Sequence, residues 1–122
     1  MHVLIVDDHA FVCVGLNATL LDEYQGVTVT TADNRTAALA ALENGGIDLV
    51  IADLFMPGAG GGFDFIALLC DTYPELPVIV LSASENPAHI RKCLDYGAIG
   101  FVTKSAPSNA LFDAIKRALN GE

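Results

Sequence analysis

The sequence has few basic residues and no long apolar run, and each shortage excludes a class of protein. Lys and Arg together number 6 against 15 Asp and Glu, which gives a formal net charge of −9 at pH 7. A surface of this sign repels nucleic-acid phosphates, so we expect this domain not to bind DNA or RNA directly. No apolar run approaches the roughly 18 residues of a transmembrane helix, and no cationic stretch opens a signal peptide. We therefore expect a soluble cytoplasmic protein without a membrane partner.

Cysteine is also scarce. The 3 cysteines, Cys13, Cys70 and Cys93, are an odd number at wide spacings and form no CxxC pair. This pattern argues against both a disulfide framework and a zinc finger. Because Cys70 and Cys93 fall on apolar stripes of expected helices, we interpret them as buried small hydrophobic residues.

What the chain does have is a regular alternation of short apolar runs and helical patterns. Continuous apolar runs at 3–6, 49–52 and 78–81 indicate strands buried on both faces of a parallel sheet. Residues 27–30 alternate between apolar and polar, and 99–102 form the fifth run, so we expect these two strands at the edges. Apolar residues at helical spacing lie between and after the runs: Val12, Leu16 and Leu20; Ala38, Ala41 and Leu42; Phe65, Ile66, Leu69 and Cys70; Ile90, Cys93, Leu94 and Gly97; Leu111, Ala114, Ile115 and Ala118.

This alternation predicts one domain over residues 1–122, with an α/β doubly wound fold. Prolines and glycines lie where elements should end or begin. Gly97 ends the fourth helical pattern, and Pro87 and Pro107 lie near expected first turns, where a missing N–H costs little.

Polar residues that could take part in chemistry lie at or just past the ends of four of the five apolar runs. They are Asp7 and Asp8 after the first, Asp53 after the third, Ser82 after the fourth and Lys104 after the fifth. In open α/β sheets, ligands bind outside the carboxyl ends of the strands, so these side chains should converge at one edge. Packed carboxylates repel one another unless a cation lies between them, and Mg²⁺ with oxygen ligands is the usual occupant.

Such a site suits phosphoryl transfer. A carboxylate can attack phosphorus to give an aspartyl-phosphate, while Lys104 and Mg²⁺ neutralise the transferring group. Ser82 could then donate to a phosphate oxygen and convert the modification into loop movement. Each residue alone has an ordinary explanation: Asp8 as a helix N-cap, Ser82 as a loop residue and Lys104 as a solvated surface lysine. Their joint placement at the ends of different strands is what predicts a site.

Four segments in order resemble the receiver domain of two-component response regulators, and the resemblance covers the entire chain. They are Val3-Leu4-Ile5-Val6-Asp7-Asp8-His9, Asp53-Leu54-Phe55-Met56-Pro57-Gly58, Leu81-Ser82-Ala83 and Gly100-Phe101-Val102-Thr103-Lys104. The resemblance implies a flavodoxin-like (βα)5 sandwich whose five parallel strands have the order 2-1-3-4-5.

The resemblance also implies a role for each residue around the site. Asp53 would be the phosphoacceptor, and Asp8, Asp53 and the backbone carbonyl of Phe55 would bind Mg²⁺. Asp7 would complete the acidic pocket, and Ser82 and Lys104 would contact the phosphoryl group. Ser82 and Phe101 would be the switch residues. The phosphoryl donor would be a sensor histidine kinase. We expect no enzyme activity beyond Mg²⁺-dependent self-phosphorylation and autodephosphorylation.

The segments Lys104-Ser105-Ala106-Pro107 and Arg117-Ala118-Leu119-Asn120-Gly121-Glu122 are similar to the NarL/FixJ (LuxR-type) subfamily. Members of this subfamily carry a helix-turn-helix output domain after such an ending. We therefore expect a receiver from a transcription regulator, without its DNA-binding output domain, and a stand-alone receiver is the alternative. Homodimerisation is open, through the fourth helix and fifth strand or through the first and fifth helices.

Three features depart from the family pattern. Phe101 replaces the commoner tyrosine, and Phe55 is larger than the family often shows, which suggests that its ring shields the acyl phosphate from water. The run Gly58-Ala59-Gly60-Gly61-Gly62 is glycine-rich and one residue longer than usual. We interpret it as a flexible loop, because the phosphate-binding motifs GxxxxGK[ST] and GxGxxG are absent.

Three other functions compete with the receiver interpretation. A pseudo-receiver would never take phosphate, but such proteins usually lack an acidic residue or the lysine. An aspartate-nucleophile phosphohydrolase would need an Asp-x-Asp pair, whereas Asp7 and Asp8 are adjacent. A flavodoxin-like FMN carrier would need a hydroxyl-rich loop after the first strand. The histidines His2, His9 and His89 show no metal-ligand spacing, so none is assigned a catalytic role.

Overall fold

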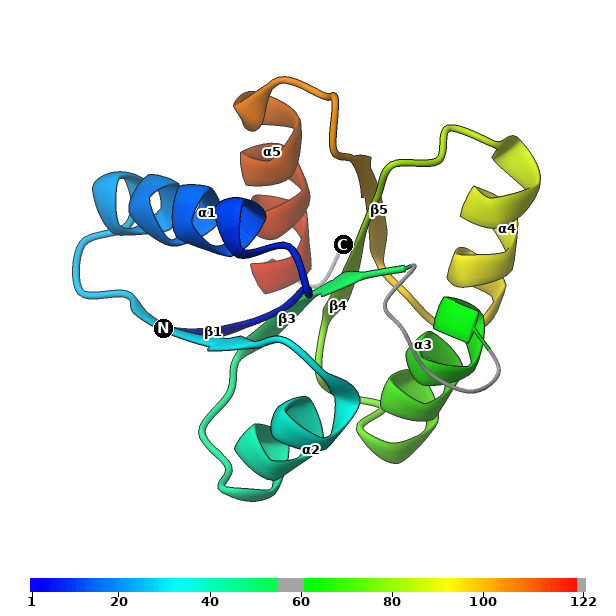
Figure 1. Ribbon diagram of the computed structural model, residues 1–122, viewed down its shortest axis with the longest axis horizontal. Helices are drawn as coiled ribbons and strands as arrows, with labels where there is room; N and C mark the ends of the chain where they lie inside the picture. The colour runs from blue at the N-terminus through cyan, green and yellow to red at the C-terminus, as the bar shows by residue number, and fades with distance from the viewer. Residues whose placement is uncertain (55–60, 121–122) are drawn as a thin grey trace.

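The computed structural model describes residues 1–54 and 61–120, and in these ranges five strands alternate with five helices (Figure 1). The elements are β1 (His2–Val6), α1 (Ala10–Glu23), β2 (Thr28–Ala32), α2 (Arg35–Glu43), β3 (Leu49–Asp53), α3 (Gly61–Thr72), β4 (Val78–Ser82), α4 (Pro87–Asp95), β5 (Gly100–Thr103) and α5 (Ser108–Leu119). None of the helices described is long and apolar enough to span a membrane.

The five strands form one parallel sheet in the order β2-β1-β3-β4-β5, which confirms the expected topology. The two strands expected at the edges, β2 and β5, are at the edges. The register pairs Val6 with Ala52 and Asp53 with Leu81, so the central strands end nearly level. This alignment brings the residues after β1, β3, β4 and β5 to the same edge of the sheet.

Helices α1 and α5 cover one face of the sheet, and α2, α3 and α4 cover the other (Figure 1). Successive residues of a strand point to opposite faces, so β1 sends Val3 and Ile5 to the first layer and Leu4 and Val6 to the second. All four side chains are fully buried. Burial of one such aliphatic side chain contributes about 1.5–3 kcal/mol, which explains why the central strands are continuous apolar runs.

Short polar residues and glycines mark where the helices begin and end. The side chain of Asn86 caps α4 by accepting the backbone N–H of Ala88 at 2.9 Å, and Pro87 occupies the first turn as expected. Gly97, which follows α4, has a φ of 112°, a conformation that other residues rarely adopt. The interpretation of Gly97 as the residue that ends this helical segment is therefore confirmed.

The structure corrects two expectations and removes one alternative. The alternative explanation of Asp8 as a helix N-cap does not hold, because the N-cap of α1 is His9, whose side chain makes no capping hydrogen bond. Leu94 is 46% exposed, because the nine-residue helix α4 packs through the narrow stripe around Cys93. Gly61 and Gly62 begin α3 instead of completing a loop. A Cβ at Gly62 would overlap the backbone carbonyl of Leu54, so only glycine permits this close approach.

Candidate functional site

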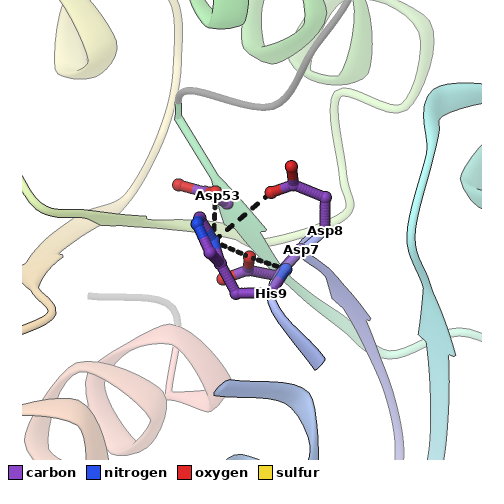
Figure 2. Close-up of side chains that lie close together, drawn as sticks. All are labelled: Asp7, Asp8, His9 and Asp53. Carbon is purple, nitrogen blue, oxygen red and sulfur yellow. Dashed lines mark hydrogen bonds and ion pairs between the residues drawn. The ribbon is translucent and has the colours of Figure 1, made fainter. Parts of the chain in front are cut away.

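Three carboxylates converge at the carboxyl edge of the sheet. Asp7 and Asp8 directly follow β1, and Asp53 is the last residue of the neighbouring strand β3. One ligand atom from each, together with a nitrogen of His9, lie within 4.8 Å of one another. Figure 2 shows the four side chains pointing toward a common centre. We refer to Asp7, Asp8, His9 and Asp53 as the acidic pocket.

Two of the three carboxylates are buried, and burial is costly for a charge that lacks a partner. Asp7 is 1% exposed and Asp53 is 3% exposed, whereas Asp8 reaches solvent. Lys104 supplies the compensating charge, because its Nζ lies 3.1 Å from Asp7 Oδ2 and 3.3 Å from Asp53 Oδ2. One ammonium cannot balance three carboxylates, so two negative charges remain. A divalent cation matches this deficit, and the carboxylate oxygens are ligands that Mg²⁺ prefers.

Lys104 is positioned by the sheet itself. Its backbone N–H donates to the carbonyl of Ser82 at 2.7 Å, which continues the pairing of Ser82 with Thr103 beyond the end of β5. This backbone hydrogen bond fixes the start of the side chain, and the ammonium lies beside Asp7 after β1 and Asp53 at the end of β3. A point charge held beside Asp53 is suited to a phosphoryl group on that carboxylate.

Ser82 is fully buried at the end of β4, one residue beyond the partner of Asp53. Its Oγ accepts the backbone N–H of Ser84 at 3.0 Å. Ser84 in turn contacts α4, since its Oγ lies 2.7 Å from His89 Nδ1. The His89 ring meets the edge of the Phe63 ring, with the centroids 5.4 Å apart. Ser82 is thus connected through Ser84 to α4, and through His89 of α4 to Phe63 of α3.

Sequence reasoning did not find this connection. Ser84 and His89 are five residues apart and belong to no motif, so their contact depends on how the loop after β4 turns.

The remaining expected switch residue, Phe101, lies on β5 and is half-buried against the core on the α2, α3 and α4 face. Phe55, whose carbonyl was expected to bind Mg²⁺ and whose ring was expected to shield the phosphate, falls outside the described residues.

His9 is a second site residue that the sequence spacing did not reveal. Its Nδ1 lies 2.8 Å from Asp7 Oδ1, 3.3 Å from Asp8 Oδ1 and 3.7 Å from Asp53 Oδ2. It also lies 3.2 Å from Lys104 Nζ. Its position directly after Asp8 at a strand end indicates the site, whereas the spacing between the histidines does not.

The expected burial holds fully for Cys93 and only in part for Cys70. Cys93 is fully buried and Cys70 is half-buried, and burial raises the pKa of both thiols, that of Cys93 to about 11. Cys13 lies beside the pocket, where its Sγ donates to the carbonyl of Asp7 at 3.4 Å. Burial and the negative charge of Asp7 raise its pKa as well. All three groups are therefore neutral thiols near pH 7.

Comparison with known proteins gives a consistent result. A profile of the response regulator receiver domain matches residues 3–116. The glycerol metabolism activator of Pseudomonas putida is 35% identical over 120 residues, which are 98% of this chain and 54% of that protein. The chain therefore spans about half the length of this curated relative.

Two solved structures are also similar. RcsB from Salmonella enterica serovar Typhimurium, bound to promoter rprA in the presence of the phosphomimetic BeF3⁻, superposes with a TM-score of 0.85 and 32% identity. The match covers 95% of this chain and 66% of that chain. Chemotaxis protein CheY4 of Vibrio cholerae superposes with a TM-score of 0.84 and 28% identity, covering 97% and 98% of the two chains.

Proposed function

Because the chain belongs to the response regulator receiver domain family, we propose that it is a signalling switch phosphorylated on Asp53. The observation that carries this assignment is the position of Asp53. It is the carboxylate that combines burial, the end of a central strand and an ammonium 3.3 Å away. Asp7 is also buried near Lys104, but its Oδ1 is occupied by the backbone N–H of His9 at 2.8 Å.

The proposed reaction transfers a phosphoryl group from a phosphohistidine of a sensor kinase. A carboxylate oxygen of Asp53 attacks phosphorus, the P–N bond breaks, and the histidine ring of the kinase leaves with the electron pair. Lys104 stabilises the negative charge on the phosphoryl oxygens, both during transfer and in the product. Asp8 and Asp53, with the carbonyl of Phe55, would hold Mg²⁺, while Asp7 completes the pocket. When bound, Mg²⁺ neutralises charge on the transferring group.

Phosphorylation then changes the conformation of Ser82 and Phe101. In the structure the Ser82 hydroxyl accepts from Ser84, and donation to a phosphoryl oxygen would reorient it. We propose that this movement displaces Ser84 and the start of α4, and that Phe101 rotates into the space released. We expect no other enzyme activity than Mg²⁺-dependent self-phosphorylation and autodephosphorylation.

We propose that residues 1–122 form the receiver domain of a cytoplasmic transcription regulator. The curated relative is nearly twice as long, and RcsB is a receiver-containing neighbour whose structure includes promoter DNA. DNA binding would belong to a separate output domain, since a net charge of −9 disfavours it here. Homodimerisation of the receiver domain remains part of this proposal.

Incubation with acetyl phosphate and Mg²⁺, followed by intact mass spectrometry, tests this function. We expect a gain of one phosphoryl group that requires Mg²⁺ and is lost in Asp53→Asn, a substitution that retains the shape of the side chain. A beryllofluoride titration controls for slow transfer from a small donor. Failure of both acetyl phosphate and beryllofluoride to modify a folded protein would favour a pseudo-receiver instead.

A further inference from the structure

The His9 side chain is placed differently from an ordinary surface histidine. Its side chain is 60% exposed, yet its Nδ1 lies within 3.7 Å of an oxygen of each of three carboxylates, two of them buried. The other two histidines of the chain contact hydroxyl groups, His2 at Thr30 Oγ1 and His89 at Ser84 Oγ. Among the three, only His9 directs a nitrogen into the acidic pocket (Figure 2).

The orientation of His9 is supported by its backbone. Asp7 Oδ1 accepts the backbone N–H of His9 at 2.8 Å and lies 2.8 Å from its Nδ1. Because His9 is also the N-cap of α1, its backbone carbonyl accepts the N–H of Cys13 at 3.2 Å. Both the backbone N–H and the backbone carbonyl of His9 are therefore hydrogen-bonded, and the ring faces the pocket while most of it is exposed to solvent.

We propose that His9 Nδ1 is a direct ligand of the divalent cation in the acidic pocket, beside the oxygens of Asp8 and Asp53. This inference rests on the proposed function, because it concerns the same cation site. A nitrogen donor changes which ions the site prefers. Mg²⁺ favours oxygen ligands and keeps its waters, whereas imidazole suits transition ions such as Co²⁺, Ni²⁺ and Zn²⁺. His9 would therefore raise the affinity for transition ions relative to Mg²⁺.

The charge balance of the pocket is compatible with this role. A neutral imidazole adds a donor without adding charge, so a divalent ion still compensates the two unbalanced carboxylates. Ligation through Nδ1 places the ring proton on Nε2, so Nδ1 then gives up its hydrogen bond to Asp7 Oδ1, which keeps the backbone N–H of His9 as its donor. Lys104 Nζ, now 3.2 Å from Nδ1, retains Asp7 Oδ2 at 3.1 Å and Asp53 Oδ2 at 3.3 Å as partners.

Calorimetric titrations with Co²⁺ and with Mg²⁺ test the selectivity. We expect His9→Ala to weaken Co²⁺ binding on the order of tenfold, as loss of groups at metal sites typically does. Mg²⁺ affinity should change by less than about threefold, because water replaces the nitrogen readily at that ion. His2→Ala is the matched control, since it removes a histidine that contacts Thr30 outside the pocket, and it should leave both affinities unchanged.

Proton NMR of the Co²⁺-bound protein gives a signature that a merely structural role would not produce. A coordinated imidazole should show an exchangeable, hyperfine-shifted ring N–H resonance, present in the wild type and in His2→Ala and lost in His9→Ala. The absence of this resonance from the wild type would overturn the assignment. Tighter Mg²⁺ binding by His9→Ala would also overturn it, because the ring would then be a competitor of the cation.

The two proposals fail in different ways. If Mg²⁺ binds and Asp53 becomes phosphorylated while the Co²⁺ affinity is the same with and without His9, only the ligand assignment is wrong. If neither Mg²⁺ nor Co²⁺ binds the folded wild-type protein, the cation site of the proposed function is wrong as well.

Discussion

Along the central strands, the interior of the sheet and its carboxyl edge bury opposite kinds of side chain. In β1, Val3 to Val6 are apolar and fully buried, and the next residue, Asp7, is equally inaccessible but charged. In β3 the change occurs between Ala52 and Asp53. Two adjacent residues at the end of each strand are therefore almost equally buried, although one side chain is apolar and the next is a carboxylate.

The two regions differ in what stabilises them. The interior gains free energy from every aliphatic group removed from water, and needs no specific partner. The edge loses free energy by desolvating carboxylates, so it depends on Lys104 and on the cation that we propose. Interior substitutions should therefore affect folding, whereas edge substitutions should affect ion binding and phosphorylation.

The largest effect on stability is expected in the interior. Ile79 of β4 is fully buried in the layer beneath α1 and α5. Ile79→Ala should lower the free energy of unfolding by about 2–5 kcal/mol, because it removes apolar contacts and leaves a cavity. Urea denaturation monitored by circular dichroism measures this change. A loss below about 1 kcal/mol would show that the core does not dominate stability.

If the carboxyl edge of the sheet binds a cation, adding Mg²⁺ should stabilise the folded protein. At a Mg²⁺ concentration about a hundredfold above its Kd, the free energy of unfolding should rise by roughly 2.7 kcal/mol. Asp8→Asn removes one ligand charge at an accessible position, so this gain should fall sharply. Thermal unfolding with Mg²⁺, and with NaCl at equal ionic strength as the control, measures the difference. An equal gain in stability for Asp8→Asn would show that Asp8 is not a ligand of the cation.

A smaller effect should appear at high pH, because the interior disfavours charge. Burial, with a smaller contribution from the neighbouring Cys70, raises the pKa of the Cys93 thiol from 9.0 to about 11. The unfolded thiol ionises first, so its contribution to stability is complete below pH 9 and is lost as the pH rises toward 11. Urea midpoints across this range should fall less steeply in Cys93→Ala. Parallel curves for the two proteins would contradict the assignment.

The smallest effect is expected on the outer surface of α1. Phe11 is 94% exposed and contributes little buried area. Phe11→Ala should therefore change the free energy of unfolding by no more than about 0.5 kcal/mol, as judged by urea denaturation. A larger loss would mean that this ring is covered in solution, for example by a second copy of the chain.

Much of the fold could be predicted because burial on both faces leaves a continuous apolar run in the sequence. The runs at 49–52 and 78–81 became β3 and β4, each extended by one residue. The run at 27–30 was less accurate, since β2 spans 28–32. Its ends are set by pairing with β1, from His2 opposite Thr28 to Val6 opposite Ala32, and no local pattern records that register. The strand order came from the family resemblance.

The candidate site was predictable to the extent that strand ends converge. Asp7, Asp8 and Lys104 followed from their positions after apolar runs, and the structure brings them together. His9 did not follow, because strand position alone does not determine where a side chain after the strand points. Its direction depends on the hydrogen bond from its own backbone N–H to Asp7. The contact between Ser84 and His89 likewise depends on loop geometry.

The central claim is that Asp53, among three neighbouring carboxylates, receives the phosphoryl group. Borohydride reduction of the acetyl phosphate-treated protein, followed by peptide mass spectrometry, tests it directly, because an aspartyl-phosphate is reduced to homoserine. The account predicts homoserine at position 53 only, and none without Mg²⁺. Homoserine at position 7 or 8, or Mg²⁺-independent modification at several aspartates, would contradict it.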